Sequence, residues 1–397
     1  MANLPDLRYN NDMEMNRFKI IKGGKPLTFA DKPRIFKWAY ITNTRLMGVV
    51  FLCVCWEMSG SEFYQLFYFD AEEFGLDTYA SFNGKGELLE WTVDAMSGGL
   101  VGTNIDITEE ETLTLVSSFI KYNLDHNIDM PANEKEYMWM YNPSRVVSHE
   151  TFGKMCEEIV SDYQLVNYYV MRLLGKDFEA ADFLTDGMRS TDHYPSITGA
   201  TLCKNTIDPI PGEPHSFMCE CVLDLDNGLH NILTCQVDVK DLKVTGFTPV
   251  SRFRVTPEEV ALKIGRPEYI TLVHYLGEMD EFTKEVTPLL KRSTMTDHEH
   301  GRVYMIFNPD NSHVNKKVFQ LNGDVYATFY VTDNHHILIS SFDEETVAVL
   351  EKELGASFIG SKCRVRKRFE FTNPVLFMFI ESGMTDFKEF VRIIEDE

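Results

Sequence analysis

Short runs of β-branched and aromatic residues recur along this 397-residue chain, and turn-forming residues separate them. Residues 34–42, 46–58 and 63–70 are three such runs, and Ser59-Gly60-Ser61 divides the second from the third. Runs of this length and composition are typical of β-strands, and short turns between them favour antiparallel pairing. Stretches with helical apolar spacing lie between the groups of strands. The sequence therefore predicts an α+β fold of mostly antiparallel sheets with packed helices.

Two breaks in this pattern predict about three units. Residues 126–148 contain repeated asparagine and proline and keep no strand or helix period, so they are interpreted as a linker. The second break lies at 265–267, where a glycine precedes an Arg-Pro pair. We expect an N-terminal α+β domain over 1–125, the linker over 126–148, a middle domain over 149–267 and a C-terminal α+β domain over 268–397.

In the N-terminal unit, a turn sequence over 83–86 predicts a hairpin between strands over 79–82 and 87–93. Further along, Thr108 and Glu111 have the spacing of a capping box, in which each residue satisfies a backbone amide of the other. Apolar residues at helical spacing follow. This pair therefore predicts the start of a helix that closes the unit.

The middle unit is predicted to be a helical hairpin followed by a curved antiparallel meander. Apolar residues at helical spacing run through 149–174, where Ser148 can cap the helix and Gly175 can end it. A short helix over 178–184 follows, and the next strand-like runs cover 196–206, 216–225, 229–239 and 243–255. This order of elements is similar to that of cystatin-like and NTF2-like cones, and the likeness implies a sheet wrapped over the long helix.

The C-terminal unit is predicted to mix strands and helices. A strand over 269–276 leads to a helix over 278–291, and a second helix over 343–354 begins at Ser341 or Asp343. Further strands are expected over 302–308, 314–321, 325–332, 337–341, 363–372 and 375–380, with a last helix from Thr385.

The charge balance is strongly acidic, with 38 lysines and arginines against 61 aspartates and glutamates, and a formal net charge of −23. Nucleic acids and anionic membranes repel such a chain, so we expect no membrane contact and no broad nucleic-acid binding. The longest apolar run near the N-terminus, 46–56, has eleven residues, whereas a membrane helix needs roughly 20. Without an expected secretory signal, the eight cysteines are interpreted as reduced thiols of a cytoplasmic protein.

Three cysteines are candidates for a thiol site in the middle unit. A two-residue Asn-Gly turn before residue 229 would set an apolar strand face beside a polar one, whereas a three-residue loop with left-handed Gly228 matches the apolar faces. The second register makes Cys219 and Cys235 cross-strand neighbours, with Cys221 diagonal to them. Three thiols can bind a soft metal or form a redox pair. The simpler interpretation is that cysteine serves as a small apolar residue facing the core.

Histidines cluster late in the chain, at His298, His300, His313, His335 and His336. If the strands between 302 and 341 form one meander, successive turns alternate between its ends. This count places His313 near His335 or His336, and places His298 and His300 at the opposite end. His313, His335 and His336 are therefore candidates for metal binding or acid–base chemistry, against the simpler interpretation of exposed loop histidines.

Five basic residues fall within the seven residues 362–368. On a strand, Arg364, Arg366 and Arg368 are predicted to share one face, opposite a buried apolar face. An exposed stripe of arginines can bind an anionic ligand or an acidic partner. Internal pairing and head-to-tail self-association compete with that role, phosphate binding ranks next and nucleic acid last. A solvated edge that resists aggregation is the simplest alternative.

Asp192, His193 and Tyr194 lie where the second helix of the middle unit gives way to a strand. If this unit is a cone, its mouth would hold a pocket beside these residues. Standard catalytic and metal motifs do not occur: the chain has no CxxC, HExxH or GxSxG sequence. Residues 355–362 approach a phosphate-binding loop, but the order of lysine and serine is reversed.

These observations lead to three hypotheses. The preferred one is a cytosolic multi-domain binding or scaffold protein that needs no cofactor and has a protein partner or a second copy of itself as ligand. The first alternative is an enzyme with a pocket in the middle unit or near the late histidines. The second is a thiol or histidine metal-binding protein. The lack of recognisable nucleophile, phosphate and metal motifs favours the binding protein.

Overall fold

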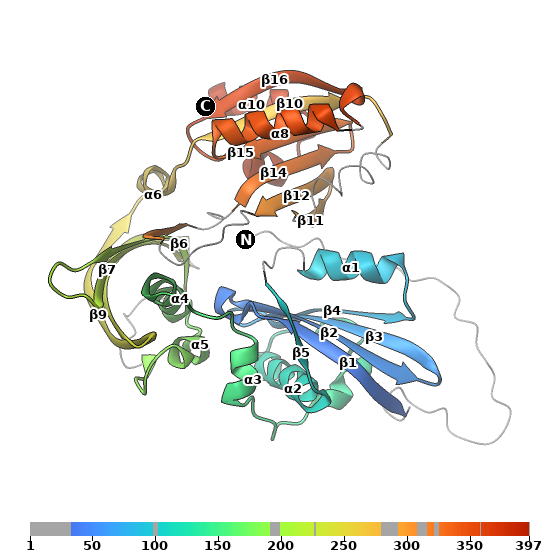
Figure 1. The fold of residues 1–397 in the computed structure, drawn as a ribbon, viewed down its shortest axis with the longest axis vertical. Coiled ribbons are helices and arrows are strands. Elements are labelled where there is room, and N and C mark those ends of the chain that lie inside the picture. Colours follow the sequence, from blue (N-terminus) through green and yellow to red (C-terminus); the bar gives the residue numbers. More distant parts are fainter. Residues whose placement is uncertain are drawn as a thin grey trace.

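The computed structural model describes residues 33–97, 102–190, 199–225, 228–278, 293–307, 316–320, 325–357 and 359–396. Within these ranges the chain forms three antiparallel sheets, of five, six and five strands, with helices packed against them (Figure 1). The predicted α+β class is confirmed. Most of the helix predicted over 278–291 lies outside the described residues. None of the helices in the described ranges is long and apolar enough to span a membrane.

The first sheet has the order β4-β3-β2-β1-β5. Its strands are β1 (Arg34–Thr42), β2 (Val49–Met58), β3 (Ser61–Asp70), β4 (Gly75–Asn83) and β5 (Asn104–Ile107). Side chains alternate between the two faces of each strand, and each face carries one helix. Val54 and its neighbours pack with Val116 of α2 (Glu109–His126), whereas Cys55 and its neighbours pack with Leu89 of α1 (Glu87–Ser97).

The strand predicted over 87–93 is wrong, because these residues begin α1. Leu89, Val93 and Met96 follow helical spacing and pack together against the sheet. The turn before residue 87 therefore leads from β4 into a helix and not into a hairpin partner.

The capping box predicted for α2 is confirmed. The hydroxyl of Thr108 accepts a hydrogen bond from the amide of Glu111, and the carboxylate of Glu111 accepts one from the amide of Thr108. The same reciprocal pair, Thr256 with Glu259, starts α6 (Pro257–Ile264). Both helices therefore begin where short-range sequence signals place them.

The middle unit contains α3 (His149–Lys154), α4 (Asp162–Leu174) and α5 (Phe178–Phe183). The meander that follows consists of β6 (Ala200–Pro209), β7 (Ser216–Leu225), β8 (His230–Lys240) and β9 (Lys243–Val255). This sheet curves around α4 (Figure 1). The ring of Phe247 on β9 packs edge-on against Tyr169 of α4. The predicted helical hairpin with a curved meander is therefore confirmed.

The single helix predicted over 149–174 is wrong, because the chain leaves helical geometry between α3 and α4. Cys156 forms an isolated β-bridge with Thr44 of the first unit, and Ser161 then caps α4. A tertiary contact thus interrupts an apolar stripe whose spacing alone would continue the helix.

The register predicted for the cysteine hairpin is confirmed. Gly228 adopts a left-handed φ of 72°, and the amide of Leu225 donates a hydrogen bond to the carbonyl of Leu229 at 2.8 Å. Cys219 is consequently the direct cross-strand partner of Cys235, and both side chains are buried. The match of apolar faces therefore predicts the loop length correctly.

The C-terminal sheet has the order β11-β12-β14-β15-β10-β16. Its strands are β10 (Glu268–Tyr275), β11 (Ser293–His298), β12 (Gly301–Phe307), β14 (Val325–Thr332), β15 (His336–Ser341) and β16 (Cys363–Phe371). One face packs on α8 (Glu344–Ala356), which Asp343 caps as predicted. The other face packs on α9 (Leu376–Glu381) and α10 (Phe387–Asp396).

The strand predicted over 314–321 does not join this meander. Its described part, β13 (Val318–Gln320), pairs with β6 and forms an edge of the middle sheet. The amide of Ile207 also donates to the carbonyl of Lys317 at 2.7 Å. The C-terminal unit therefore contributes a strand to the sheet of its neighbour.

The strand predicted over 375–380 is wrong, because these residues form α9. Glu268 of β10 is 2% exposed, and its Oε2 accepts hydrogen bonds from the amides of Val375 and Leu376. Its Oε1 accepts a third from the hydroxyl of Ser340. A carboxylate from a distant strand therefore satisfies the first amides of this helix.

One apolar core joins the first sheet to the middle unit. It includes residues of β1, β2, α2, α4, β7 and β8, and Tyr137 and Met140 from the segment 126–148 are buried in it. Two further cores lie on the opposite faces of the C-terminal sheet. The proposed division into three domains with a linker stays a prediction.

The left-handed backbone of Gly228 in the cysteine hairpin leads to a test. We expect Gly228→Ala to lower the free energy of unfolding by about 1 kcal/mol, because an L-residue is strained at this φ. A Cβ at Gly228 meets nothing within 4 Å, so the cost comes from the backbone alone. Gly86→Ala is the matched control, since its Cβ also meets open space and its φ is not left-handed. Equal urea midpoints for both variants would contradict the three-residue loop.

Candidate functional site

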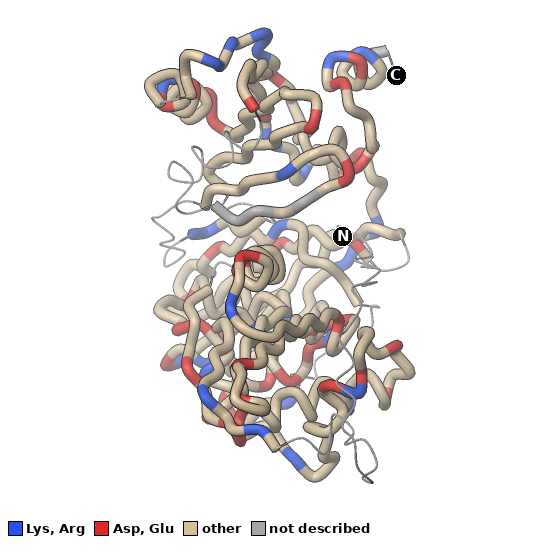
Figure 2. Tube along the Cα trace, turned by 90° about the vertical axis from the view of Figure 1, so that its right-hand side faces the viewer, with Lys and Arg blue, Asp and Glu red and all other residues tan. Residues whose placement is uncertain are grey.

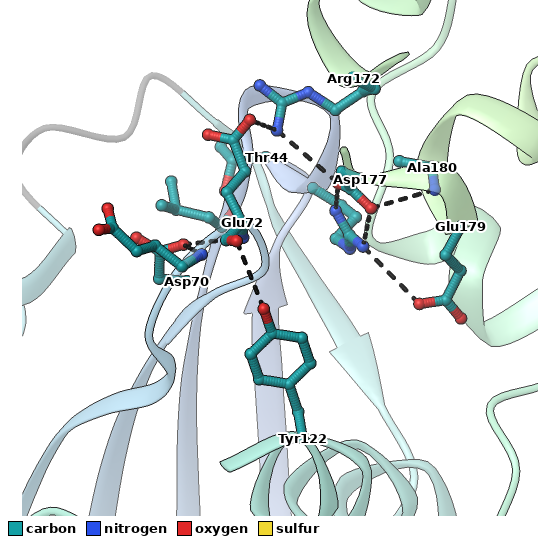
Figure 3. Close-up of polar contacts among 11 residues, drawn as sticks. Thr44, Asp70, Glu72, Tyr122, Arg172, Asp177, Glu179 and Ala180 are labelled. Carbon is teal, nitrogen blue, oxygen red and sulfur yellow. Dashed lines mark hydrogen bonds and ion pairs between the residues drawn. The ribbon is translucent and has the colours of Figure 1, made fainter. Parts of the chain in front are cut away.

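Two arginine side chains are buried where the first sheet meets the helices of the middle unit (Figure 3). Arg45 comes from the 3-10 turn η2 (Arg45–Met47) between β1 and β2, and Arg172 comes from the last turn of α4. The two residues are 3% and 2% exposed. Arginine is rarely buried unless a carboxylate matches its charge, so its partners decide what this junction can do.

Asp177, at the start of α5, matches Arg45 with two hydrogen bonds. Nη2 donates to Oδ1 at 2.8 Å, and Nη1 donates to Oδ2. Oδ1 also accepts from the amide of Ala180 at 3.3 Å and so caps α5. Burial alone would raise the pKa of Asp177, but the attraction and hydrogen bonds of Arg45 outweigh burial, and the pKa is lowered.

Arg172 is matched less completely. Its Nη1 lies 3.0 Å from Oε1 of Glu72 and 3.7 Å from Oδ2 of Asp177, but Nη1 and Nε make no hydrogen bond. Burial raises the pKa of Glu72, and Arg172 offsets this shift only in part. The absence of a side chain at Gly175 leaves space for the Arg172–Glu72 pair, because a Cβ at this position would clash with Oε1 of Glu72.

This junction is a cluster of opposed charges. Oε2 of Glu179 lies 3.7 Å from Nη2 of Arg45, and the hydroxyl of Tyr122 donates to the backbone carbonyl of Glu72 at 3.3 Å (Figure 3). Burial raises the pKa of the neighbouring Cys156 thiol to about 12, which makes it a poor nucleophile at neutral pH. The charges therefore fix the first sheet to α4 and α5.

Sequence reasoning missed this junction, because its residues come from distant segments, with Arg45 and Asp177 132 positions apart. The sequence carries no local signal for it. Arg172 lies on the side of the predicted helix opposite the apolar stripe, where an arginine is expected to face solvent. Its burial is set by packing against the first sheet, and nothing local identifies its partners.

The basic segment lies on β16, an edge strand with five consecutive exposed residues. The prediction that its three arginines share one face is wrong, because a bulge at Arg366 interrupts the pairing with β10. Arg364 lies opposite His274 and Arg368 lies opposite Thr271, so their side chains point to opposite faces of the sheet. The stripe is thus divided between two surfaces.

The three arginines also differ in their partners. Arg368 binds the carboxylate of Glu351 on α8, with Nε 2.9 Å from Oε1 and Nη2 bonded to Oε2. Arg366 donates from Nη2 to Nδ1 of His274 at 2.9 Å. Among the described residues, neither Arg364 nor Arg366 has a carboxylate within ion-pair distance. Basic residues are visible along β16 at the top of the molecule (Figure 2).

Two histidines extend the basic row across the sheet. His274 on β10 pairs with Arg364 on one side and with His336 of β15 on the other. The imidazole rings of His274 and His336 are 5.4 Å apart in an edge-to-face arrangement. His274 was not singled out in the sequence, because it lies in a short apolar strand and only the register aligns it with the arginines.

The other late histidines are arranged differently from the expectation. Nδ1 of His335 contacts the carbonyl of Gly277 at 3.1 Å, and His313 lies outside the described residues. The predicted separation of His300 from His335 is wrong, since the carbonyl of His300 accepts from the amide of Asp333 at 3.1 Å. The reason is β13: with that strand in another sheet, the meander has one strand fewer and the two turns fall at the same end.

The three cysteines of the β7–β8 hairpin lie together on the concave, buried face. Hydrogen bonds from Cys219 and Cys221 lower the pKa of Cys235, whereas burial opposes this shift. The same bonds, together with burial, raise the pKa of Cys219 and Cys221. In the part of the chain that the structure describes, no group of three histidine, cysteine or acidic side chains is arranged to hold a metal ion. Metal binding by these cysteines stays a prediction.

The pocket predicted at Asp192, His193 and Tyr194 falls on residues outside the described ranges. A pocket of about 320 Å³ lies elsewhere, at the break between α3 and α4. Two of its charged groups already have partners within the protein. Lys243 donates to a backbone carbonyl at 2.7 Å, and the carboxylate of Glu157 accepts from two neighbouring side chains.

No protein-family model matches this chain, and no curated protein matches it.

The buried ion pair leads to a stability prediction. We expect Asp177→Asn to lower the free energy of unfolding by about 3 kcal/mol, because it leaves Arg45 and Arg172 buried with one fewer charge to match them. Glu179→Gln is the control, since its side chain is 65% exposed and its loss should cost less than about 0.5 kcal/mol. Urea denaturation of both variants measures the difference, and equal midpoints would contradict the assigned role.

The Arg45–Asp177 ion pair also predicts that the free energy of unfolding depends on pH. The pKa of Asp177 is lower in the folded protein than in the unfolded chain, so its contribution to stability is fully present above about pH 4. It is lost as the pH falls from there through the folded pKa. We expect the stability gap between the native protein and Asp177→Asn to be constant near neutral pH and to narrow below about pH 4. A gap that stays unchanged in acid would refute the assignment.

Proposed function

We propose that this protein is a multi-domain binding protein, and that the β16 edge recognises an acidic, extended segment of another protein. The supporting observation is electrostatic. Arg364 and Arg366 are exposed and have no carboxylate partner among the described residues, in a chain whose net charge is −23. A guanidinium binds carboxylates in a forked geometry, so an acidic segment is the complementary ligand.

Other arginines of the chain differ from Arg364 and Arg366 because they have carboxylate partners. Arg45 and Arg172 are buried beside carboxylates, and the exposed Arg368 binds Glu351. With 61 acidic residues in the chain, internal partners are abundant. Arg364 and Arg366 are thus positive charges that the described fold leaves available for a ligand.

The backbone of β16 favours an extended ligand. The outer side of this strand meets no other strand in the described ranges. An extended peptide can add to such an edge through main-chain hydrogen bonds, while its acidic side chains reach the arginines. Basic side chains on an edge also repel basic strands, so the surface selects acidic segments over basic ones.

Other observations bear on location and on rival ligands. All eight cysteines are free, which supports a reducing compartment such as the cytoplasm. The negative field of the chain disfavours nucleic acid. A second copy of this acidic chain can itself supply the segment, so self-association is one outcome to measure. No comparable observation favours the enzyme or the metal-binding alternative.

The test replaces the two available arginines. We expect the full-length protein to bind a fluorescein-labelled ten-glutamate peptide at low salt, and Arg364→Ser with Arg366→Ser to weaken binding at least about tenfold. Fluorescence anisotropy measures the affinity, and sedimentation at several salt concentrations measures the oligomeric state. Both properties should depend on salt, because the contacts are ionic.

A charge-matched control distinguishes binding at β16 from an effect of the protein's net charge. Lys121→Ser with Lys352→Ser also removes two exposed positive charges, but from α2 and α8. This control should bind the peptide as the native protein does. If the arginine variant folds and keeps both its affinity and its oligomeric state, β16 is a solvated edge and the proposal is wrong.

A further inference from the structure

Four basic side chains gather on the sheet face beside α10. His336, His274 and Arg364 occupy paired positions on three adjacent strands, so their Cα atoms follow one another at intervals of roughly 5 Å. Arg366, displaced by the bulge, reaches back to His274 at 2.9 Å. Side chains of this length, placed this closely, can converge on a single anion.

The hydrogen bond of Arg366 assigns the proton on His274. A guanidinium only donates hydrogen bonds, so Nδ1 of His274 is the acceptor and its proton resides on Nε2. With Nδ1 engaged by Arg366, His274 can offer its Nε2–H to a ligand. While this hydrogen bond is kept, a proton taken up with an anion goes to a group other than Nδ1 of His274.

His336 is the group that can take up this proton. It faces charged groups from three elements: His274 on β10, Arg366 on β16, and Asp386 and Lys388 at the start of α10. Burial lowers the pKa of His336, the basic neighbours act in the same direction, and Asp386 opposes them. Oδ1 of Asp386 is itself engaged, since it accepts from the amide of Lys388 at 2.8 Å. An anion bound beside His336 would stabilise its protonated form.

We infer that this row is a subsite for a phosphate monoester carried by the acidic partner, and that His336 takes up a proton when the phosphate binds. The inference rests on the proposed function, because the docked segment presents the phosphate. A phosphate ester offers three oxygens and up to two charges, which match two guanidinium forks and the N–H groups of the imidazoles. A carboxylate has two oxygens and one charge, and leaves some of these donors unsatisfied.

The first measurement uses sulfate as the probe, because sulfate keeps both charges where a phosphate ester gains a proton near about pH 6. We expect the affinity of the full-length protein for sulfate to rise roughly threefold or more between about pH 7.5 and 5.5. Calorimetry in two buffers of different ionisation enthalpy should report uptake of up to one proton per sulfate. Binding without proton uptake would overturn the inference.

Two variants assign the effect to residues. His336→Gln should retain sulfate binding but lose its pH dependence and its proton uptake, whereas Arg364→Ser with Arg366→Ser should lose sulfate binding at every pH. His230→Gln on β8 is the control, because this histidine lies in the middle sheet. Unchanged proton uptake in His336→Gln would assign the proton to another group and contradict the inference. Unchanged near-ultraviolet circular dichroism establishes that each variant is folded.

Two peptides separate this inference from the proposed function. One is an acidic ten-residue peptide with a single phosphoserine, and the other has glutamate at that position. We expect the phosphopeptide to bind at least about tenfold more tightly. If the glutamate peptide binds through Arg364 and Arg366 as tightly as the phosphopeptide, the phosphate subsite fails and the proposed function stands. If sulfate binds with proton uptake but neither peptide binds, the proposed function fails instead.

Discussion

Two arginine side chains are enclosed between the first sheet and the helices of the middle unit, and Asp177 lies within ion-pair distance of both. A buried charge is tolerated only beside an opposite one, and the loss of one partner typically costs about 3–5 kcal/mol. The turn that carries Arg45 and the junction of α4 with α5 must therefore assemble together. The break between α3 and α4 and the apolar core shared by the two units agree with this mutual dependence.

Features fixed by neighbouring residues could be predicted from the sequence. The capping boxes of α2 and α6 need only residues three positions apart, and both are present. The cysteine hairpin could be derived because a strand has a period of two, so that only one loop length joins two apolar faces. The pairing of Cys219 with Cys235 follows from that rule.

Features fixed by distant residues could not be predicted. The cap of α9 is the carboxylate of Glu268, more than a hundred positions earlier, so residues 375–380 resemble a strand when considered alone. The bulge at Arg366 moves Arg368 to the other face, and β16 contains no glycine that would indicate a bulge in advance. The row of His274, His336 and Arg364 exists only through the register of three strands, which the order of elements leaves open. The sequence thus indicates which charged residues the candidate basic site contains, but not how they are arranged.

β13 belongs to the C-terminal unit by position and to the middle sheet by pairing. Gln320 secures it by donating a hydrogen bond to the carbonyl of Ile264 at 2.7 Å, at the end of α6. On a ribosome, the middle sheet therefore stays incomplete after its own four strands have emerged, until residue 320 has been synthesised as well. A shortened chain that stops before β13 leaves β6 as an open edge, which can pair with the same edge of another copy and begin aggregation.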